Sequence, residues 1–364
     1  MAFELRKYTH PDFTEEKFVN APNAALVKAP RDGVAPDNFH ALSIFPEYFK
    51  IDGKWLMVEE SRMDTVPMFD GEKVQAVEAR RLKEGDRVIC GRTENCEEGI
   101  FMHAHGFDEK KETGDTFAFR TGRSRETAFS KDVDEIVELL KHEKEHGNVV
   151  WVLGPAFSFD LKARKALSAL INAGYADAVL AGNALATHDL EGAYMNTALG
   201  QNIYTQQNAP NGHYNHLELI NKVREAGSIP EFIEKYNIDN GIIYTAVKKG
   251  IPIVLGGSIR DDGPLPEVYG NCYEAQDAMR SCVRKATTVI TMATMLHSIA
   301  VGNMTPSYRV MADGTVRQTY FYICDISEFT VNKLADRGSL SSKGIITNVQ
   351  DFVCNVADGL GLEY

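Results

Sequence analysis

The sequence predicts an α/β protein in which a doubly wound parallel sheet follows a smaller β-rich domain. From about residue 149 onward, short apolar runs alternate with segments of helical periodicity, which is the pattern of βαβ units. The runs are apolar throughout, as in strands buried on both faces. They cover residues 149–153, 178–181, 251–255, 288–292, 320–324 and 344–349. The chain is thus expected to comprise an irregular amino-terminal arm (1–35), a β-rich domain (36–126) and a parallel-sheet domain (127–364).

Composition restricts the classes of partner. The 364 residues are 44% hydrophobic and 25% charged, as in an ordinary globular protein, and the net charge is −12. An acidic chain without a basic face argues against nucleic acid or an anionic membrane as a partner. No run approaches 18 apolar residues, and the first residues have no apolar signal core. Six cysteines without a Cys-x-x-Cys pair favour reduced thiols and a cytoplasmic location.

The β-rich domain is predicted from short strand signals with turn residues between them. Residues 48–51 and 54–58 flank Asp52-Gly53, a dipeptide typical of a tight hairpin turn. Residues 74–77 and 86–90 continue the pattern. Residues 94–125 are polar and glycine-rich, which predicts a long connection.

Helices are predicted between the apolar runs of the larger domain. Their apolar residues recur every three or four positions, and glycine, serine or proline marks several of their ends. The expected helices cover residues 130–146, 163–171, 216–225, 230–236 and 274–286, with a further one around Phe329, Val331 and Leu334.

The third apolar run ends in the stretch on which the functional prediction depends. Gly256 and Gly257 permit a tight turn and a close approach of a ligand to the backbone. Ser258 leads to Arg260, Asp261 and Asp262, and an open α/β sheet binds its ligands at this place, beyond the carboxyl end of a strand. The alternative is a solvated loop in which the arginine and the aspartates pair with one another.

Polar residues also follow the first two runs. Gly154-Pro155 occupies the first βα turn, where phosphate is normally bound, but no Gly-x-Gly-x-x-Gly follows any run. A nucleotide would therefore require a variant of the usual arrangement. Asn183 and His188 follow the second run and offer hydrogen bonding and proton exchange. The alternative is a helix-capping asparagine and a histidine satisfied by Asp189.

Two further strand ends complete the predicted crevice. Thr294 and His297 follow the fourth run, although a histidine in so apolar a stretch is most often a core residue. Asp325 and Ile326 follow the fifth run, and an acidic residue at such a place suits the ribose hydroxyls of adenosine. Asp325 could equally cap the next helix. A metal site is not expected, because His103 and His105 lack further ligands.

Several of these stretches resemble the archaeal and cyanobacterial type of ornithine cyclodeaminase, the family labelled by a region shared with lysine-ketoglutarate reductase/saccharopine dehydrogenase. The similarity covers roughly residues 35–350. Phe157-Ser158-Phe159-Asp160 departs from the pattern. The matching motifs are 177–189, 256–266, 293–303, 333–339 and Arg62-Met63-Asp64.

The resemblance implies a Rossmann-like, deoxyhypusine-synthase-like domain that holds NAD tightly, which agrees with the missing glycine fingerprint. It implies conversion of L-ornithine to L-proline and ammonia, with the hydride returned to the cyclic imine. An amino-acid substrate and a homo-oligomer are accordingly expected, in arginine, ornithine and proline metabolism.

Roles within this reaction are assigned by position and chemistry. Arg260 is expected to bind the α-carboxylate, Asp261 or Asp262 the amine and the proton, and His297 to assist as acid or base. Arg62, Asp64, Asn183 and His188 are the expected substrate-binding residues. The expected cofactor-binding residues are Gly154, Pro155, Asn183, Gly256, Gly257, Ser258, Thr294, Asp325 and Ile326.

Two other functions stay open at this point. An NAD-dependent amino- or imino-acid dehydrogenase, or a cyclodeaminase of another diamino acid, would use the same crevice. One methylene of the substrate changes binding by only about 1–3 kcal/mol, so the sequence does not separate these substrates. A non-catalytic dinucleotide-binding regulator would have no need of the Arg-Asp-Asp cluster, which favours an enzyme.

Overall fold

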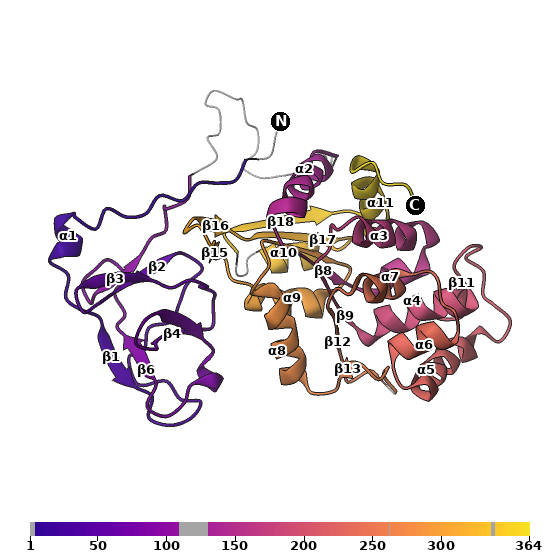
Figure 1. Cartoon of the computed structure of the whole chain (residues 1–364), viewed down its shortest axis with the longest axis horizontal. Helices are drawn as coiled ribbons and strands as arrows, with labels where there is room; N and C mark the ends of the chain where they lie inside the picture. The colour runs from indigo at the N-terminus through magenta and orange to yellow at the C-terminus, as the bar shows by residue number, and fades with distance from the viewer. Residues whose placement is uncertain (1–3, 109–129, 262, 336–338) are drawn as a thin grey trace.

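The computed structural model describes residues 4–108, 130–261, 263–335 and 339–364. A β-rich region and a larger region built on a parallel sheet lie side by side (Figure 1). In the described part of the chain, no helix is both long and apolar enough to cross a membrane.

The largest sheet among the described residues has seven strands, and all its neighbouring strands are parallel. Their order is β13-β12-β9-β8-β14-β17-β18, so the direction of winding reverses between β8 and β14. This arrangement confirms the predicted doubly wound fold. The strands are β8 (Val149–Leu153), β9 (Ala178–Gly182), β12 (Ile253–Gly256), β13 (Val268–Tyr269), β14 (Thr288–Met292), β17 (Tyr320–Asp325) and β18 (Ser341–Ile346).

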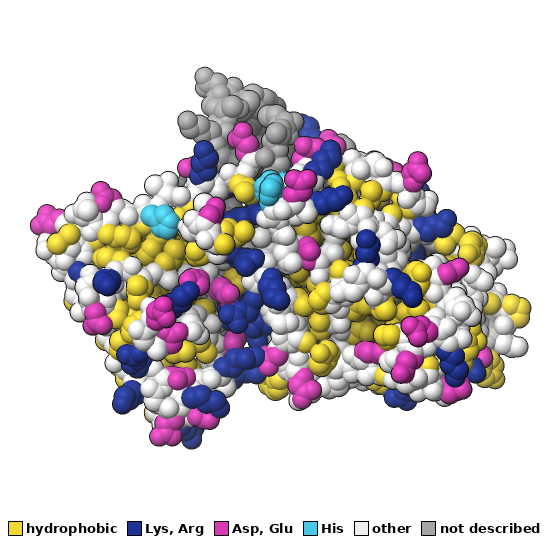
Figure 2. Space-filling model, viewed as in Figure 1, with side chains coloured by type: hydrophobic (Ala, Val, Ile, Leu, Met, Phe, Trp, Pro, Cys, Tyr) yellow, Lys and Arg dark blue, Asp and Glu magenta, His cyan; other side chains and the backbone are white. Residues whose placement is uncertain are grey.

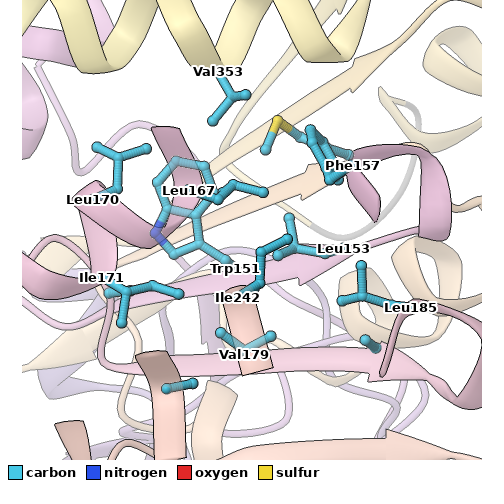
Figure 3. Packing of buried hydrophobic residues seen from close by; sticks show 14 of the residues in the cluster. Trp151, Leu153, Phe157, Leu167, Leu170, Ile171, Val179, Leu185, Ile242 and Val353 are labelled. Atoms are coloured by element: carbon cyan, nitrogen blue, oxygen red, sulfur yellow. The ribbon is translucent and has the colours of Figure 1, made fainter. Parts of the chain in front are cut away.

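Helices cover both faces because alternate residues of each buried strand point to opposite sides. Trp151 and Leu153 belong to the core shared with α2 (Ser130–His146), α3 (Leu161–Asn172), α7 (Ile242–Lys249) and α11 (Val349–Gly359). Figure 3 shows Trp151 surrounded by Leu167 and Leu170 of α3 and by Val353 of α11. Val150 and Val152 belong to the opposite core, with α8 (Cys272–Val283), α9 (Met295–Met304) and α10 (Glu328–Ala335). Full burial of each such large side chain contributes about 1.5–3 kcal/mol.

Most predicted helices and strands occur within a few residues of the expected bounds. The helices α5 (Asn215–Ala226) and α6 (Ile229–Lys235) are among them, and the Ser228 side chain caps α6 by accepting a hydrogen bond from the Glu231 N–H at 3.2 Å. The last strand differs, since β18 covers 341–346 instead of 344–349. Asn348 accepts hydrogen bonds from the N–H groups of Gln350 and Asp351, so helix α11 starts where the strand was expected to end.

Two largely buried helices follow strands at places where the residue pattern has no helical periodicity. They are α4 (Asn183–Met195), after β9, and α9, after β14. Both are buried or half-buried over most of their length, so polar residues do not mark an outer face. A short 3₁₀ helix, η2 (Pro155–Phe159), follows β8.

The β-rich region consists of two antiparallel sheets, and the predicted hairpin is confirmed. In the hairpin, Ile51 pairs with Lys54, and both Asp52 (φ 49°) and Gly53 (φ 77°) have the positive φ of a type I′ turn. The sheet orders are β1-β6-β4-β5 and β3-β2-β7. The strands are β1 (Ala25–Lys28), β2 (Glu47–Ile51), β3 (Lys54–Met57), β4 (Val66–Phe69), β5 (Val74–Val77), β6 (Arg87–Cys90) and β7 (Ile100–Met102).

Two segments of this region differ from expectation. The arm expected over residues 1–35 contains α1 (Glu16–Val19) and β1, and β1 pairs with β6, so this segment is part of the sheet. The connection expected over residues 94–125 contains β7, which pairs with β2. The expected boundary at residue 126 falls outside the described residues.

The two regions are joined by hydrogen bonds and ion pairs. A hairpin, β15 (Tyr308–Val310) and β16 (Val316–Gln318), follows α9, and the Tyr308 hydroxyl donates to the carbonyl of Val58. Arg284 at the end of α8 lies 2.6 Å from Glu60. These contacts set α8 and α9 against the β-rich region.

Candidate active site at the carboxyl ends of the strands

The loops after β8 and β14 meet at the point where the winding reverses. Gly154 donates its N–H to the carbonyl of Met292 at 2.9 Å. A Cβ atom at Gly154 would lie only 1.8 Å from the carbonyl oxygen of Ala293, which itself has a left-handed φ of 56°. Gly154 is therefore required by the contact between two loops. Pro155 begins η2 directly behind it.

His297 projects from the first turn of α9 toward the ends of two other strands. A Cβ atom at Gly182, the last residue of β9, would lie 2.9 Å from Cε1 of His297. A Cβ atom at Gly256, the last residue of β12, would lie 3.3 Å from Nε2. The two glycines thus provide the space that the imidazole occupies. Gly182 was not among the predicted site residues, although its place at a strand end could have indicated it.

The His297 ring is oriented by Thr294. The hydroxyl of Thr294 lies 3.1 Å from Nδ1, so Nε2 is the ring nitrogen that faces the glycines. Burial lowers the pKa of His297 below its usual 6.5, and the charge of Asp261 raises it by a smaller amount. The imidazole is accordingly neutral at pH 7, with one nitrogen available as a proton acceptor or donor.

The loop after β12 brings Asp261 close to this histidine. Asp261 accepts a hydrogen bond from the N–H of Ser258 at 2.8 Å, and the Ser258 hydroxyl accepts one from the N–H of Arg260 at 3.1 Å. The Arg260 side chain is exposed, in agreement with a cation that can bind an incoming anion. Gly257 donates its N–H to Tyr269 at 2.9 Å and thereby ties the loop to β13. Asp262 lies outside the described residues.

Asn183 and His188 lie on α4, and the structure separates them. The Asn183 side-chain oxygen accepts hydrogen bonds from the N–H of Leu265, at 3.1 Å, and from the hydroxyl of Thr187. Asn183 thus fixes the far end of the Arg260 loop. His188 lies one and a half turns further along, with Nδ1 3.1 Å from the buried carboxylate of Glu191. These contacts place His188 in the packing of α4.

Asp325 stands at the end of β17, as predicted. One of its oxygens accepts a hydrogen bond from the N–H of Ser327 at 2.8 Å, which is the local turn that precedes α10. The side chain is half-exposed. Ile326 and Phe329, beside it, are 74% and 67% exposed.

The strand ends present a surface that fits a dinucleotide. Exposed apolar side chains suited to a flat aromatic base border this edge, and they come from four different segments. Half-exposed Asp325 can accept hydrogen bonds from ribose hydroxyls, and exposed Gly257 leaves the backbone accessible. The apolar side chains are Ile259, Met295, Leu296, Ile326, Phe329 and Ile346.

Arg62 and Asp64 lie apart from His297, in a pocket of about 320 Å³ between the β-rich region and helices α8 and α9. Arg62 is only 3% exposed and pairs with Glu78 at 2.5 Å, while Asp64 is exposed and has a left-handed φ of 61°. Figure 2 shows lysine and arginine side chains gathered along this junction. No group of three or more histidine, cysteine, aspartate or glutamate side chains that could hold a metal ion occurs in the described part of the chain.

Comparison with known proteins identifies the family of both regions. The family model described as "Arginine dihydrolase ArgZ-like, C-terminal, Rossmann fold" matches residues 133–356, and the one described as "Arginine dihydrolase ArgZ-like, C-terminal, first region" matches residues 46–127. The chain is 39% identical to an ornithine cyclodeaminase of Archaeoglobus fulgidus over 331 residues, which is 90% of this chain and 76% of that protein. It is 36% identical to the bifunctional arginine dihydrolase/ornithine cyclodeaminase AgrE of a Nostoc species over 340 residues, 91% of this chain and 46% of that one.

Solved structures give the same result. A putative LOR/SDH protein of Methanococcus maripaludis superposes with a TM-score of 0.83 at 34% identity, over 93% of this chain and 98% of that chain. AgrE in its ternary complex with ornithine and NAD⁺ superposes with a TM-score of 0.59 at 33% identity, over 94% of this chain and 46% of that chain. The resemblance inferred from the sequence motifs is thereby confirmed. The chain belongs to the family that comprises the archaeal ornithine cyclodeaminases and the carboxyl-terminal regions of the ArgZ-like arginine dihydrolases.

Proposed function

We propose that the protein is an ornithine cyclodeaminase that converts L-ornithine to L-proline and ammonia. One structural observation carries the proposal: a neutral, half-buried imidazole faces two glycine strand ends, and the Asp261 carboxylate acts on its charge. The 39% identity to a protein named ornithine cyclodeaminase is the second support for the proposal. When bound, NAD⁺ supplies the hydride acceptor for the substrate α-carbon and later returns the hydride, so that no net oxidation occurs.

The residues at the strand ends divide the remaining tasks. The exposed guanidinium of Arg260 binds the α-carboxylate as a charge-assisted pair. Asp261 or Asp262 binds the substrate amine and takes up its proton. His297 exchanges a proton through Nε2, because Nδ1 is committed to Thr294. The exposed apolar rim excludes water from the reacting carbon.

The cofactor is proposed to lie across the ends of β12, β14 and β17. Asp325 binds ribose through the oxygen that Ser327 leaves free, and Ile326 packs against the base. Backbone groups at the predicted positions after β8, β12 and β14 meet the phosphates and the nicotinamide. These positions are Gly154, Pro155, Gly256, Gly257, Ser258 and Thr294, while Asn183 supports them through the loop at Leu265.

Homo-oligomerisation and a cytoplasmic location are part of the proposal. All six cysteines are free, which suits a reducing compartment. Apolar side chains are also exposed around the start of α5, where Tyr214 (60%) and Leu217 (57%) form a surface that can pair with another chain. Light scattering of the purified protein measures the oligomeric state directly.

The decisive test is incubation of the purified protein with L-ornithine, with and without added NAD⁺. Proline and ammonia in equal amounts, without lasting NADH, are expected. Accumulating NADH with a keto or imino product would indicate a dehydrogenase instead. Protein that releases NAD on denaturation but leaves ornithine and other diamino acids unchanged would indicate a regulator. Arg260→Ala is expected to abolish turnover, whereas Arg92→Ala, at an exposed arginine of the β-rich region, is expected to retain it.

A further inference from the structure

The pocket at the junction of the two regions is built from charged residues of both. Arg62, Asp64, Glu78 and Arg80 line it from the β-rich region, and Arg280 of α8 and Asn303 of α9 line it from the other side. Its volume of about 320 Å³ is that of a small-metabolite site. A molecule bound there would contact both regions at once.

Helix α9 separates this pocket from the candidate active site. His297 is in the first turn of α9 and Asn303 is six residues later, so the two lie about 9 Å apart along the helix axis. At 100° per residue they also point to different sides of the helix. His297 faces the strand ends, whereas Asn303 lines the pocket.

The pocket lining has more positive than negative charge. Arg62 and Arg280 are 3% and 6% exposed, and both lie within 2.8 Å of the same Glu78 oxygen, which therefore serves two guanidinium groups. Arg80 adds a third cation beside Gln276 and Asp277. The lining residues thus have three positive and two negative charges, and one of the negative charges, Asp64, is exposed.

Two buried polar atoms of the residues that line this pocket have no hydrogen-bond partner. They are the side-chain oxygen of Asn303 and Nε of Arg280, which has only its ion pair with Glu78. Buried polar groups are normally paired, and one that lines a cavity indicates a ligand that supplies the missing group. An acceptor without a partner calls for a ligand that carries a hydrogen-bond donor.

We infer that this pocket is a second binding site, which takes a free α-amino acid. The carboxylate meets the guanidinium groups of Arg62, Arg80 and Arg280, and the ammonium meets the Asn303 oxygen and Asp64. A zwitterion supplies both a carboxylate for the arginines and a donor for the unpaired Asn303 oxygen, whereas a simple anion supplies only the first. Arg62 and Asp64 thereby contact an amino acid away from the hydride-transfer site. The choice of substrate and product as probes rests on the proposed function.

Binding is tested by titration calorimetry of the full chain with L-proline and L-ornithine. Arg260→Ala serves as the background, because it disables the strand-end site. One saturable event is expected to remain, and acetate, which lacks the ammonium, is expected to bind at least about tenfold more weakly. Equal binding of acetate would show a general anion site and overturn the inference. Absence of any saturable event with either amino acid would do the same.

A matched pair of variants locates the event. Arg80→Gln is expected to weaken binding about tenfold or more through loss of a charge-assisted contact. Arg81→Gln is expected to leave it nearly unchanged, because Arg81 shares Asp277 with Arg80 but lies outside the lining of the pocket. An equal loss of affinity in both variants would show that only the change in net charge matters, and it would overturn the inference of a site at Arg80.

Turnover separates this inference from the proposed function. Arg80→Gln in the otherwise unchanged chain is expected to retain kcat. If it abolishes turnover, the pocket is the substrate site itself and the inference of a second site fails. If the chain is inactive toward ornithine but calorimetry gives the expected binding pattern, the proposed function is wrong and the inference of an amino-acid site in the pocket is supported.

Discussion

The His297 imidazole lies directly against Gly256, whose Cβ position would be 3.3 Å from Nε2. Gly182 is closer still, with its Cβ position 2.9 Å from Cε1. The ring fits there because Gly182 and Gly256 have no Cβ atoms, and its hydrogen bond to Thr294 fixes its orientation.

Gly182→Ala is expected to displace the imidazole and to lower kcat about 100-fold, the effect of an error of roughly 1 Å in a catalytic group. Steady-state kinetics measures the change. Gly270→Ala is the control, because a Cβ atom at Gly270 has no neighbour within 4 Å. Equal activity in both variants would remove His297 from the mechanism.

Thr294→Val removes the hydroxyl that orients His297 while keeping the size of the side chain. A loss of about tenfold or more in kcat is expected, because the wrong tautomer presents no proton at Nε2. Thr294→Ser, which keeps the hydroxyl, is expected to restore most of the activity. If Thr294→Ser does not restore the activity, the loss of kcat in Thr294→Val is caused by altered packing and not by the missing hydroxyl.

The pH dependence follows from the half-buried His297, whose pKa lies below 6.5 because partial burial disfavours the charged form. The rate is expected to fall with an apparent pKa below 6.5 as the ring becomes protonated. Asp261 raises this pKa, so Asp261→Asn is expected to lower the pKa of His297 further, which an NMR titration of the imidazole measures without turnover. An unchanged or higher pKa of His297 in that variant would contradict the expected effect of Asp261.

The same shift predicts a stability effect of defined sign. The unfolded chain binds a proton at His297 near pH 6.5, and the folded chain does so only at lower pH, so unfolding takes up a proton between the two values. The contribution to stability is complete above pH 6.5 and is lost as the pH falls. Urea denaturation at several pH values is expected to show this loss in the wild type and a reduced loss in His297→Gln.

Gly154→Ala is expected to destabilise the fold by about 1–3 kcal/mol or more, because its Cβ atom would lie 1.8 Å from the carbonyl oxygen of Ala293. Thermal unfolding measures the loss. Gly302→Ala in α9 is the comparison, since its Cβ atom would be at an ordinary 3.6 Å from Phe321. Alanine is the better helix former there and is expected to add about 0.5–1 kcal/mol.

The strands of the parallel sheet were predictable from sequence because burial on both faces leaves an unbroken apolar run, as in Val149–Leu153. Helices α4 and α9 were not, because they are themselves buried and show little amphipathic periodicity. β1 was missed because its four residues are largely exposed, and its place comes from pairing with β6.

The candidate site was predictable to the extent that parallel strands end at one edge. That rule brought Asp261 near His297 without any knowledge of their distance. It could not foresee that His188 would be held by Glu191, because this pair depends on the helical spacing within α4. Nor could it place Arg62, whose partner Glu78 and neighbour Arg280 depend on how the two regions meet.

The contact between Gly154 and Ala293 has a consequence for protein engineering. In the usual dinucleotide-binding fold, the glycines of the first βα turn serve the pyrophosphate and the packing of their own strand and helix. Here that turn is fitted to the backbone of the loop after β14, and each constrains the other. A transplanted turn would have to be accompanied by a redesigned 293–297 segment, which carries Thr294 and His297. The phosphate-binding turn and the catalytic geometry would therefore have to be re-engineered together.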